Sequence, residues 1–523
     1  MSVRRIMGIE TELGITSSQV DARGMPVTPM VLSGQVVLAH AAATPAGSAL
    51  PAGAGWDYAD ETPLRDARGF EMARTLAHRS QLTDLEDPTI ANSVLSNGAP
   101  LYVGHAHPEY SSPEVTSPLD AVRWDRAGEV VARTAVHHLA EQGLEVRLYK
   151  NNVDGKGASY GTHENYLVPR SVPFDRLAQQ LIPFLVARPV IAGAGRVGIG
   201  QASERPGFQL SQRADYLEAE VGLETTLRRP IVNTRDEPHA TPHLWRRLHV
   251  IVGDATMADV TTYLAVGSLS AVLRVIETHP HLLEGLALAQ PVAAAQTISH
   301  DPSLRATVPL ADGRELSGLD LLEAHLDAVE EAAGSGHEAW AEHDADREAA
   351  GTVTGDVLAR WRSVLDTLRV DPADAAEQVE WVAKLTLLQR FRERSCVGWD
   401  DPRIAAMDIQ WHDLDPARGL AQKLRAAGRL ERLVTDDAIA AAVTDPPEDT
   451  RTWFRGECVR RYGPHGDVRA ASWDSVVMAD DRGRLQRVRM DDPNHGTRRQ
   501  VGVLLDRHER SASLLPELVV EDA

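Results

Sequence analysis

Cysteine is scarce in this sequence, with only Cys396 and Cys458 in 523 residues. Two cysteines cannot build a disulfide scaffold or a zinc site of cysteine ligands. Long apolar runs are also missing, because prolines and arginines interrupt the best candidate, residues 181–200, and a membrane span requires roughly 18 residues. Arg4 and Arg5 lead directly into a predicted strand and not into a signal peptide. These absences predict a soluble cytoplasmic protein without a membrane partner.

Positive charge is in deficit, since 54 lysines and arginines face 75 aspartates and glutamates and the formal net charge is −21. Such a chain is a poor general binder of nucleic acid or of an anionic membrane. It still leaves room for a local basic cleft that holds an anionic ligand. The remaining composition, 43% hydrophobic and 25% charged, is typical of a globular protein.

Short strands separated by turns are predicted for the first half of the chain, at 6–15, 101–104, 145–149, 162–167, 208–213 and 248–252, with helices at 119–142 and 174–186. Later the periodicity becomes helical, at 260–278, 319–333, 358–368 and 375–394. Strands followed by helices favour an α+β fold with an antiparallel sheet. We expect one large domain over 1–434 and a small C-terminal domain over 435–523.

An unusual segment, about 41–79, interrupts the large domain as an inserted loop. Its first part, 41–55, consists almost entirely of Ala, Gly, Pro, Ser and Thr, which is typical of a flexible linker. The part that follows, 56–70, is rich in aromatic residues and paired charges, which is not the composition of disorder. We therefore predict a functional loop here.

Glu10 and Glu12 lie in a predicted strand, where alternate side chains share one face, so their carboxylates project together while Ile9 and Leu13 face the core. Two carboxylates this close repel each other unless a cation or an arginine lies between them. Oxygen ligands of this kind suit Mg²⁺. The alternative is a solvated polar face of a half-exposed strand.

Polar clusters also occur at 102–114 and at 151–166, where His163 and Asn165 share one strand face. Single histidines of the first cluster are typical of a polar loop. Residues 193–198 match the pattern GxGxxG, but the residues after them cannot begin the helix that a dinucleotide site requires. A glycine-rich hairpin is expected there.

Three later strands supply cationic side chains. In the first, Gln209, Ser211 and Arg213 alternate on one face. The second carries Arg235, and in the third Arg247 and His249 alternate. Arginine presents a planar fork of donors that matches phosphate oxygens. Each arginine alone is typical of a structural or surface group. Together with the glutamates and histidines, they indicate a nucleoside triphosphate and Mg²⁺ site on an open antiparallel sheet.

These motifs resemble, in order along essentially the whole chain, those of the Pup deamidase/depupylase family. This family is close to the Pup ligases within the carboxylate-amine ligase superfamily related to glutamine synthetase. The matching segments are 6–14, 56–70, 97–114, 148–166, 195–200, 207–213, 233–240, 381–392, 454–458 and 471–475. The resemblance implies a curved antiparallel sheet backed by helices, as in glutamine synthetase, plus a small C-terminal domain. The loop ending in 56–70 and the strand end at 105–112 resemble depupylases more than ligases.

The resemblance also implies an activity: removal of Pup, the prokaryotic ubiquitin-like protein, from lysines of pupylated proteins, and deamidation of a C-terminal glutamine of Pup, with a functional link to the bacterial proteasome. It implies ATP, or ADP plus phosphate, and Mg²⁺, with the nucleotide retained between turnovers. The implied metal ligands are Glu10, Tyr102, Glu109, His163 and His249. The implied nucleotide contacts are Glu12, Ser112, Asn165, Arg213, Arg235, Arg247, Arg455 and Trp473.

Two positions depart from the family pattern. Gly104 stands where the family has a catalytic aspartate, and glycine offers neither a nucleophile nor a base. Pro100 stands where the family usually has an arginine near the nucleotide. Three alternatives are therefore open: an active depupylase, a catalytically impaired protein that binds Pup and nucleotide, and a Pup ligase. Conceivable substitutes for the missing carboxylate are Asp57, Asp60, Glu61 and Asp154.

Overall fold

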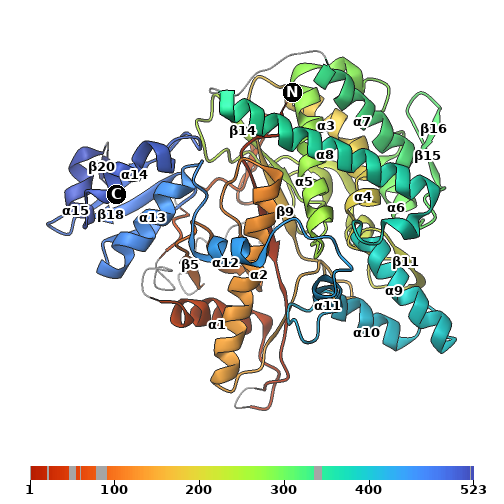
Figure 1. Cartoon of the computed structure of the whole chain (residues 1–523), viewed down its shortest axis with the longest axis horizontal. Coiled ribbons are helices and arrows are strands. Elements are labelled where there is room, and N and C mark those ends of the chain that lie inside the picture. Colours follow the sequence, from red (N-terminus) through yellow and green to blue (C-terminus); the bar gives the residue numbers. More distant parts are fainter. Residues whose placement is uncertain are drawn as a thin grey trace.

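A six-stranded sheet forms the centre of the protein (Figure 1). The computed structural model describes residues 2–20, 23–45, 55–58, 61–77, 91–334, 344–518 and 520–522. The strands follow in the order β14 (Trp245–Val250), β9 (Thr162–Pro169), β1 (Met7–Glu12), β7 (His107–Ser111), β6 (Pro100–Gly104) and β5 (Asn92–Val94). Every neighbouring pair is antiparallel, which confirms the predicted kind of sheet.

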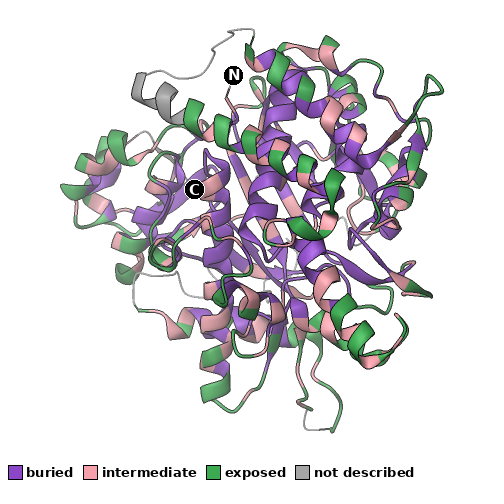
Figure 2. Ribbon diagram, turned by 45° about the vertical axis from the view of Figure 1, so that its right-hand side comes forward, coloured by how far each residue is buried: buried purple, intermediate pink, exposed green. Residues whose placement is uncertain are grey.

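One face of this sheet is buried under helices. Ile9 on β1, Val168 on β9 and Leu248 on β14 belong to the main hydrophobic core. The same core takes side chains from α2 (Pro118–Glu141), α3 (Phe174–Ala187) and α5 (Asp259–Thr278). Figure 2 shows this buried centre, with exposed residues on the outer helices. Because alternate residues of a strand face opposite sides, burying these side chains turns the polar ones toward the other face.

The predicted helices are all present, and several extend beyond the predicted bounds, but the helix predicted from residue 375 begins only at Glu380. The further helices are α4 (Pro189–Ala192), α6 (Pro291–Ser299), α7 (Gly318–Gly334), α8 (Asp344–Val370), α9 (Glu380–Ser395), α10 (Pro402–Trp411) and α11 (Leu420–Ala426). Within the described parts of the chain, α5 alone is long and apolar enough to cross a membrane, and 94% of its apolar stretch is buried in the protein. A core helix has this pattern of burial.

A second, smaller sheet lies in the C-terminal part, at the left of Figure 1. Its strands are β17 (Val468–Ala471), β18 (Ser475–Ala479), β19 (Leu485–Arg489) and β20 (Val520–Asp522), accompanied by α13 (Thr452–Tyr462) and α14 (Arg498–Asp506). Its core also takes in Trp56 and Val94 from the N-terminal part. The preceding helix, α12 (Asp436–Thr444), packs against α2. The domain boundary at residue 434 stays a prediction.

The helix α1 (Pro29–Ala43) was not predicted, and it includes the first residues of the expected linker, 41–43. This helix is apolar around most of its circumference, so its sequence lacks the polar face that marks a surface helix. Leu32 and Val36 pack with Leu139 of α2, which stabilises the helix through burial. Most of the remaining linker, 46–54, and positions 59–60 and 78–79 of the inserted loop lie outside the described residues.

The predicted strand at 208–213 is wrong in its second half. β11 covers only Arg205–Gln209, and it pairs with β10 (Arg196–Ile199) as the expected glycine-rich hairpin. Beyond it, Asp254 accepts hydrogen bonds from the Gln212 amide and from the Ser211 hydroxyl, so side chains replace a strand partner. Alternation of polar and apolar residues cannot reveal such long-range partners.

Candidate functional site

Two adjoining cavities, of about 130 and 60 Å³, lie on the polar face of the main sheet, where it meets the C-terminal part. Glu10, His239, Arg247 and Trp473 line both. Most of the predicted site residues meet here, namely Glu10, Glu12, Tyr102, Gly104, Glu109, Ser112, His163, Asn165, Arg235, Arg247, His249 and Trp473. Residues that lie up to almost 500 positions apart in the chain therefore form one site.

Strand register explains why these side chains meet. Glu12 on β1 lies opposite Glu109 on β7, which in turn lies opposite Tyr102 on β6. On the other side of β1, Glu10 lies opposite His163 on β9. Directly paired residues of neighbouring antiparallel strands project from the same face, so the sheet itself sets this arrangement.

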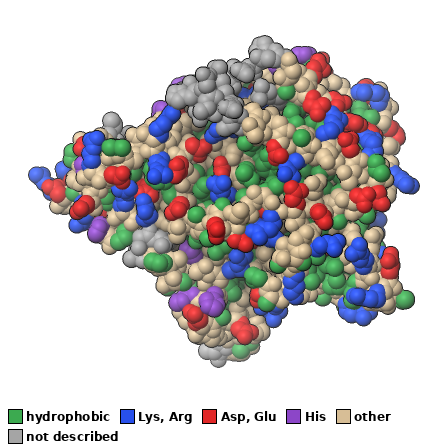
Figure 3. Space-filling view, in the orientation of Figure 1, with side chains coloured by type: hydrophobic (Ala, Val, Ile, Leu, Met, Phe, Trp, Pro, Cys, Tyr) green, Lys and Arg blue, Asp and Glu red, His purple; other side chains and the backbone are tan. Residues whose placement is uncertain are grey.

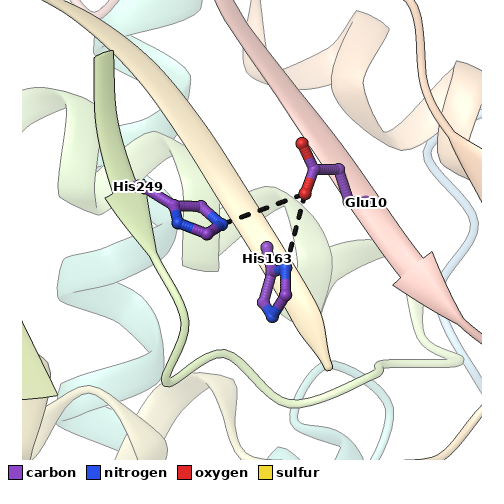
Figure 4. Close-up of side chains that lie close together, drawn as sticks. All are labelled: Glu10, His163 and His249. Atoms are coloured by element: carbon purple, nitrogen blue, oxygen red, sulfur yellow. Dashed lines mark hydrogen bonds and ion pairs between the residues drawn. The ribbon is translucent and has the colours of Figure 1, made fainter. Parts of the chain in front are cut away.

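Glu10, His163 and His249 form a compact cluster in which one ligand atom from each residue lies within 4.8 Å of the others (Figure 4). The Glu10 Oε2 is 3.3 Å from His163 Nδ1 and 3.9 Å from His249 Nε2. The two imidazole rings meet edge to face, with centroids 4.8 Å apart. One carboxylate and two imidazoles at this spacing make a set of ligands for a divalent cation.

The protonation states also suit a cation. Burial, followed by Arg247 and His163, lowers the pKa of His249 well below its usual value, so the ring is neutral and able to ligate. Its Nε2 is buried and has no hydrogen-bond partner among the described residues. Burial opposes ionisation of Glu10, but the hydrogen bond from His163 and the charge of Arg247 outweigh it and lower the pKa of this carboxyl. A cation would satisfy the orphaned nitrogen and the carboxylate together.

Negative charge is crowded around this cluster. Burial, then the charges of Glu12 and Glu10, raise the pKa of Glu109 well above its usual value. For Glu12, burial opposes ionisation, but contacts that include a hydrogen bond with His105 lower the pKa to about 2. Three carboxyl groups compete for the same small space, and a bound cation would relieve their repulsion. Glu109 and Tyr102 thus lie where they could complete a ligand set.

Two arginines supply the positive charge of the larger cavity. Arg247 donates to Asn165 Oδ1 over 2.9 Å and to Glu237 Oε2 over 3.1 Å. The Arg235 Nε lies 3.3 Å from the same Glu237 oxygen. No lysine is among the described residues that line this cavity. Arg247 also reaches the acidic cluster, with its Nη1 3.7 Å from Glu10 Oε1. The arginine pair therefore makes the cationic wall of the cavity.

Arg213 and Arg455 lie outside the lining of both cavities. Arg213 is buried and donates to the backbone carbonyls of Tyr160 and Ile251. Arg455 is buried between Glu114 and the carbonyl of Trp473, and its guanidinium lies 5.4 Å from the centre of the Trp473 ring. Arg455 therefore supports a wall of the site through Trp473, whereas Arg213 contacts no lining residue through these bonds.

Gly104 lines the larger cavity at the end of β6. A Cβ added to this residue would overlap Oε2 of Glu109, whose side chain supplies all its nearest neighbours. Of the conceivable substitute carboxylates, Asp57 pairs with Arg487 and Asp154 lies in an exposed turn, whereas Glu61 lines the cavity. Asp60 lies outside the described residues. The other departure from the family pattern, Pro100, also lines the larger cavity.

The turn after Gly104 is held in a strained form. His105 and Ala106 have φ values of +48° and +75°, which are unfavourable for residues other than glycine. The Ser33 hydroxyl of α1 donates to the Ala106 carbonyl over 2.8 Å. This contact helps to keep His105 beside Glu12, with its Nδ1 3.6 Å from Glu12 Oε1.

A segment of the inserted loop, residues 55–58 and 61–72, here called the strap, crosses the site. At one end the Asp57 amide donates to the Ala471 carbonyl over 2.9 Å, and Asp57 pairs with Arg487 at 2.6 Å. At the other end the Ala67 amide donates to the Thr234 carbonyl over 2.8 Å. The strap thereby joins the small C-terminal sheet to the connection between β13 (Pro230–Asn233) and β14, and its described residues are packed against the rest of the protein.

Several lining residues are not among the site residues predicted from the sequence, namely Trp56, Tyr58, Glu237 and His239. The aromatic and charged composition of 56–70 signalled a functional loop without saying where it lies. Glu237 and His239 belong to an irregular connection, where no strand alternation assigns a face. Trp56 meets Trp473 edge to face at 4.9 Å, so the strap and the C-terminal part close one wall together.

The smaller cavity is mostly apolar, with Ile6, Met7, Ile9, Leu167, Pro238, Trp473 and Pro493 among its lining residues. Ser112 and Asn165 add polar groups at its edge. Such a lining suits a flat, largely apolar group with a few hydrogen-bonding positions. The cavity lies next to the arginine pair, because Arg247 lines both spaces.

Known proteins resemble this chain over almost its full length. It is 49% identical over 524 residues to the Pup deamidase/depupylase of Mycobacterium tuberculosis (strain ATCC 25618 / H37Rv), covering 99% of this chain and 100% of that protein. It is 48% identical to the depupylase of Acidothermus cellulolyticus, covering 99% of each chain. A Pup–protein ligase of Pseudarthrobacter chlorophenolicus is 39% identical, over 96% of this chain and 99% of that protein.

The fold is also that of a solved relative. The crystal structure of the ligase PafA in complex with Pup matches with a TM-score of 0.76 and 32% identity, covering 98% of this chain and 94% of that one. PafA in complex with ADP matches with a TM-score of 0.71 and 33% identity, over 82% and 90% of the two chains. These matches confirm the predicted glutamine-synthetase-like fold. The model of the family described as Pup-ligase protein matches residues 5–477, and the chain belongs to this family, in the branch of the depupylases and the Pup ligases.

Proposed function

We propose that this protein is a depupylase and Pup deamidase. It hydrolyses the isopeptide bond between the C-terminal glutamate of Pup and a substrate lysine, and it converts a C-terminal glutamine of Pup to glutamate. The relatives that are 48–49% identical over the whole chain carry these names, whereas the ligases are 38–42% identical. Pup and pupylated proteins are then its partners.

The cluster of Glu10, His163 and His249 beside the Arg235–Arg247 pair is the observation that carries this proposal. Glu10, His163 and His249, with Glu109 and Tyr102 next to them, would hold Mg²⁺. Arg235 and Arg247 would hold the phosphates of ATP, or of ADP and phosphate, and the apolar cavity with Trp473 would take the base. The cation supplies charge neutralisation for phosphates and polarisation of an oxygen. Arg455 supports the wall at Trp473, as described above.

In this site the protein's own groups orient the substrate and limit the access of bulk water. Hydrolysis adds the elements of water across the C–N bond and leaves a carboxylate on Pup and a free amine on the lysine. Gly104 contributes no proton-accepting group, and the Glu109 carboxyl occupies the space above it. Trp56 and Trp473 close the wall opposite the sheet and lower the local dielectric, which strengthens the interactions of the charged groups inside.

The proposal is tested by incubating the protein with ATP, Mg²⁺ and a pupylated substrate. Release of free Pup and of unmodified substrate is expected. A Pup–lysine conjugate formed from free Pup, together with ADP release, would instead show a ligase. Retention of the conjugate over a long incubation, with ADP binding intact, would contradict the hydrolase.

A catalytically impaired protein that binds Pup and nucleotide is the second candidate, and Gly104 is the observation in its favour. Loss of a catalytic nucleophile or base commonly costs several orders of magnitude in rate. Gly104→Asp decides between the two. Turnover by the natural chain supports the hydrolase, whereas turnover only after Gly104→Asp shows an impaired protein whose remaining site is intact.

A further inference from the structure

Glu237 holds the two arginines of the larger cavity with one carboxylate oxygen. Its Oε2 accepts a hydrogen bond from Arg247 Nη2 over 3.1 Å and lies 3.3 Å from Arg235 Nε. Its side chain is almost fully buried, with 3% exposure, so water does not screen these contacts strongly. The cationic wall is therefore already paired with an anion that belongs to the chain itself.

The other oxygen of the same carboxylate holds the strap. Glu237 Oε1 accepts a hydrogen bond from the Thr62 amide over 2.6 Å. Three residues further along the strap, the Arg65 carbonyl accepts from the Asp236 amide over 2.9 Å. One carboxylate thus joins the arginine pair to the strap, with one oxygen on each side.

A phosphate and this carboxylate need the same donors. Both anions are recognised by the guanidinium fork, and two anions on one fork repel each other. Repulsion between acids is already present here, because burial and then Glu237 raise the pKa of the strap residue Glu61 to about 7. Among the described residues lining the larger cavity, no lysine is available as an alternative partner for the phosphate.

We propose that Glu237 is an internal competitor for phosphate at the Arg235–Arg247 pair, and that it couples phosphate binding to release of the strap at Thr62. This inference rests on the proposed function, which places the phosphates on the two arginines. When a phosphate takes the donors of Arg247 and Arg235, the Glu237 carboxylate turns away from them. The Thr62 amide then loses its acceptor, so the strap is held less tightly.

Glu237→Gln tests the competition, because glutamine keeps the size of the side chain and retains an oxygen for Thr62. Binding of ADP and of adenosine is measured by calorimetry in the presence of Mg²⁺ at constant ionic strength. We expect ADP affinity to rise about tenfold, the order of one charge-assisted hydrogen bond, while adenosine affinity stays unchanged. Weaker ADP binding by Glu237→Gln would overturn the proposal and show that Glu237 only orients the arginines.

Glu61→Gln is the matched control, since Glu61 lines the same cavity but accepts its hydrogen bond from the Trp56 indole and not from Arg235 or Arg247. At a pH above the pKa of Glu61, where its carboxyl is ionised, this change removes one negative charge from the cavity and leaves the competitor in place. The ADP affinity should rise less in Glu61→Gln than in Glu237→Gln. An equal rise would mean that loss of any negative charge in the cavity has the same effect, and it would refute direct competition. Absence of ADP binding by the natural chain would instead refute the proposed function.

The natural chain provides a second measurement that does not depend on the folding of a variant. Hydrogen exchange of the Thr62 amide is compared with saturating ADP and with saturating adenosine. Faster exchange with ADP is expected, because only ADP brings phosphate to the arginines. Equal or slower exchange with ADP would contradict the coupling to the strap.

Discussion

His249 presents a buried ring nitrogen to the acidic cluster without a hydrogen-bond partner among the described residues. His249→Ala should therefore lower the affinity for a divalent cation by about tenfold or more, as loss of a ligand does. Calorimetric titration of the metal-free protein measures this change. His137→Ala, on the exposed end of α2, is the control and should leave the affinity unchanged. Equal affinity in both variants would remove His249 from the ligand set.

The ligand set at this cluster also predicts a preference among metals. Two imidazoles and one carboxylate suit Mn²⁺ better than Mg²⁺, which prefers a shell of oxygen atoms. In the same titration, Mn²⁺ should bind more tightly than Mg²⁺ to the natural chain. The difference should shrink in His249→Ala, because the variant has lost one of the nitrogen ligands. Tighter binding of Mg²⁺ would mean that the oxygen ligands dominate the site.

At the level of elements, the turn between β6 and β7 joins the sheet to α1 and to the site. Ala106 adopts a φ of +75°, which a glycine adopts without strain. Ala106→Gly should raise the free energy of unfolding by about 0.5–1 kcal/mol, measured by denaturant titration. Ala132→Gly within α2 is the contrasting control and should lower it by about 1 kcal/mol. Destabilisation by Ala106→Gly would show that other contacts outweigh the strain.

The sequence predicts which side chains share a face in strands with alternating residues, but it does not do so for the segments between the strands. The period of two predicts that Glu10 and Glu12 share one strand face, and it assigns His163 and His249 to faces of two other strands. The structure brings all four side chains together. Glu237 and His239 could not be placed in this way, because they lie in an irregular connection. The overlap between a Cβ at Gly104 and Glu109 depends on the turn geometry, which sequence spacing does not contain.

The helix α1 shows a different limit. Its apolar residues have no polar stripe to reveal a helical period, and its stability depends on α2, almost a hundred residues later in the chain. The packing of the strap likewise depends on Ala471 and Thr234, which are remote in sequence. Local composition indicates a functional loop at the strap only, and tertiary contacts decide the structure of both segments.

At the level of the whole molecule, buried histidines link stability to pH. Burial lowers the pKa of His325 in α7 from 6.5 to about 4, against the opposing hydrogen bond to Leu321. The unfolded chain therefore binds a proton that the folded protein excludes, and stability falls as the pH decreases from about 6.5 toward 4. This histidine contributes a loss of up to about 3 kcal/mol over that range.

His325→Phe should reduce this acid-induced loss, because phenylalanine does not titrate and fits beside Phe184, whose ring centroid lies 5.4 Å away. Denaturant titrations at several pH values between 4 and 7 measure the slope in both proteins. The variant should show a shallower slope, whatever its stability at neutral pH. Parallel curves for the two proteins would show that His325 titrates alike in the folded and unfolded states.

The central position of β1 has a consequence for synthesis of the protein. This strand leaves the ribosome before its two neighbours, β7 and β9, which follow about 100 and 150 residues later, and Trp473 of the same site follows far behind them. Glu10 and Glu12 therefore have no neighbouring strand until β7 and β9 have been made. A nascent chain cannot form the complete site before Trp473 has been made, so ligand binding distinguishes chains that include the C-terminal sheet from shorter ones.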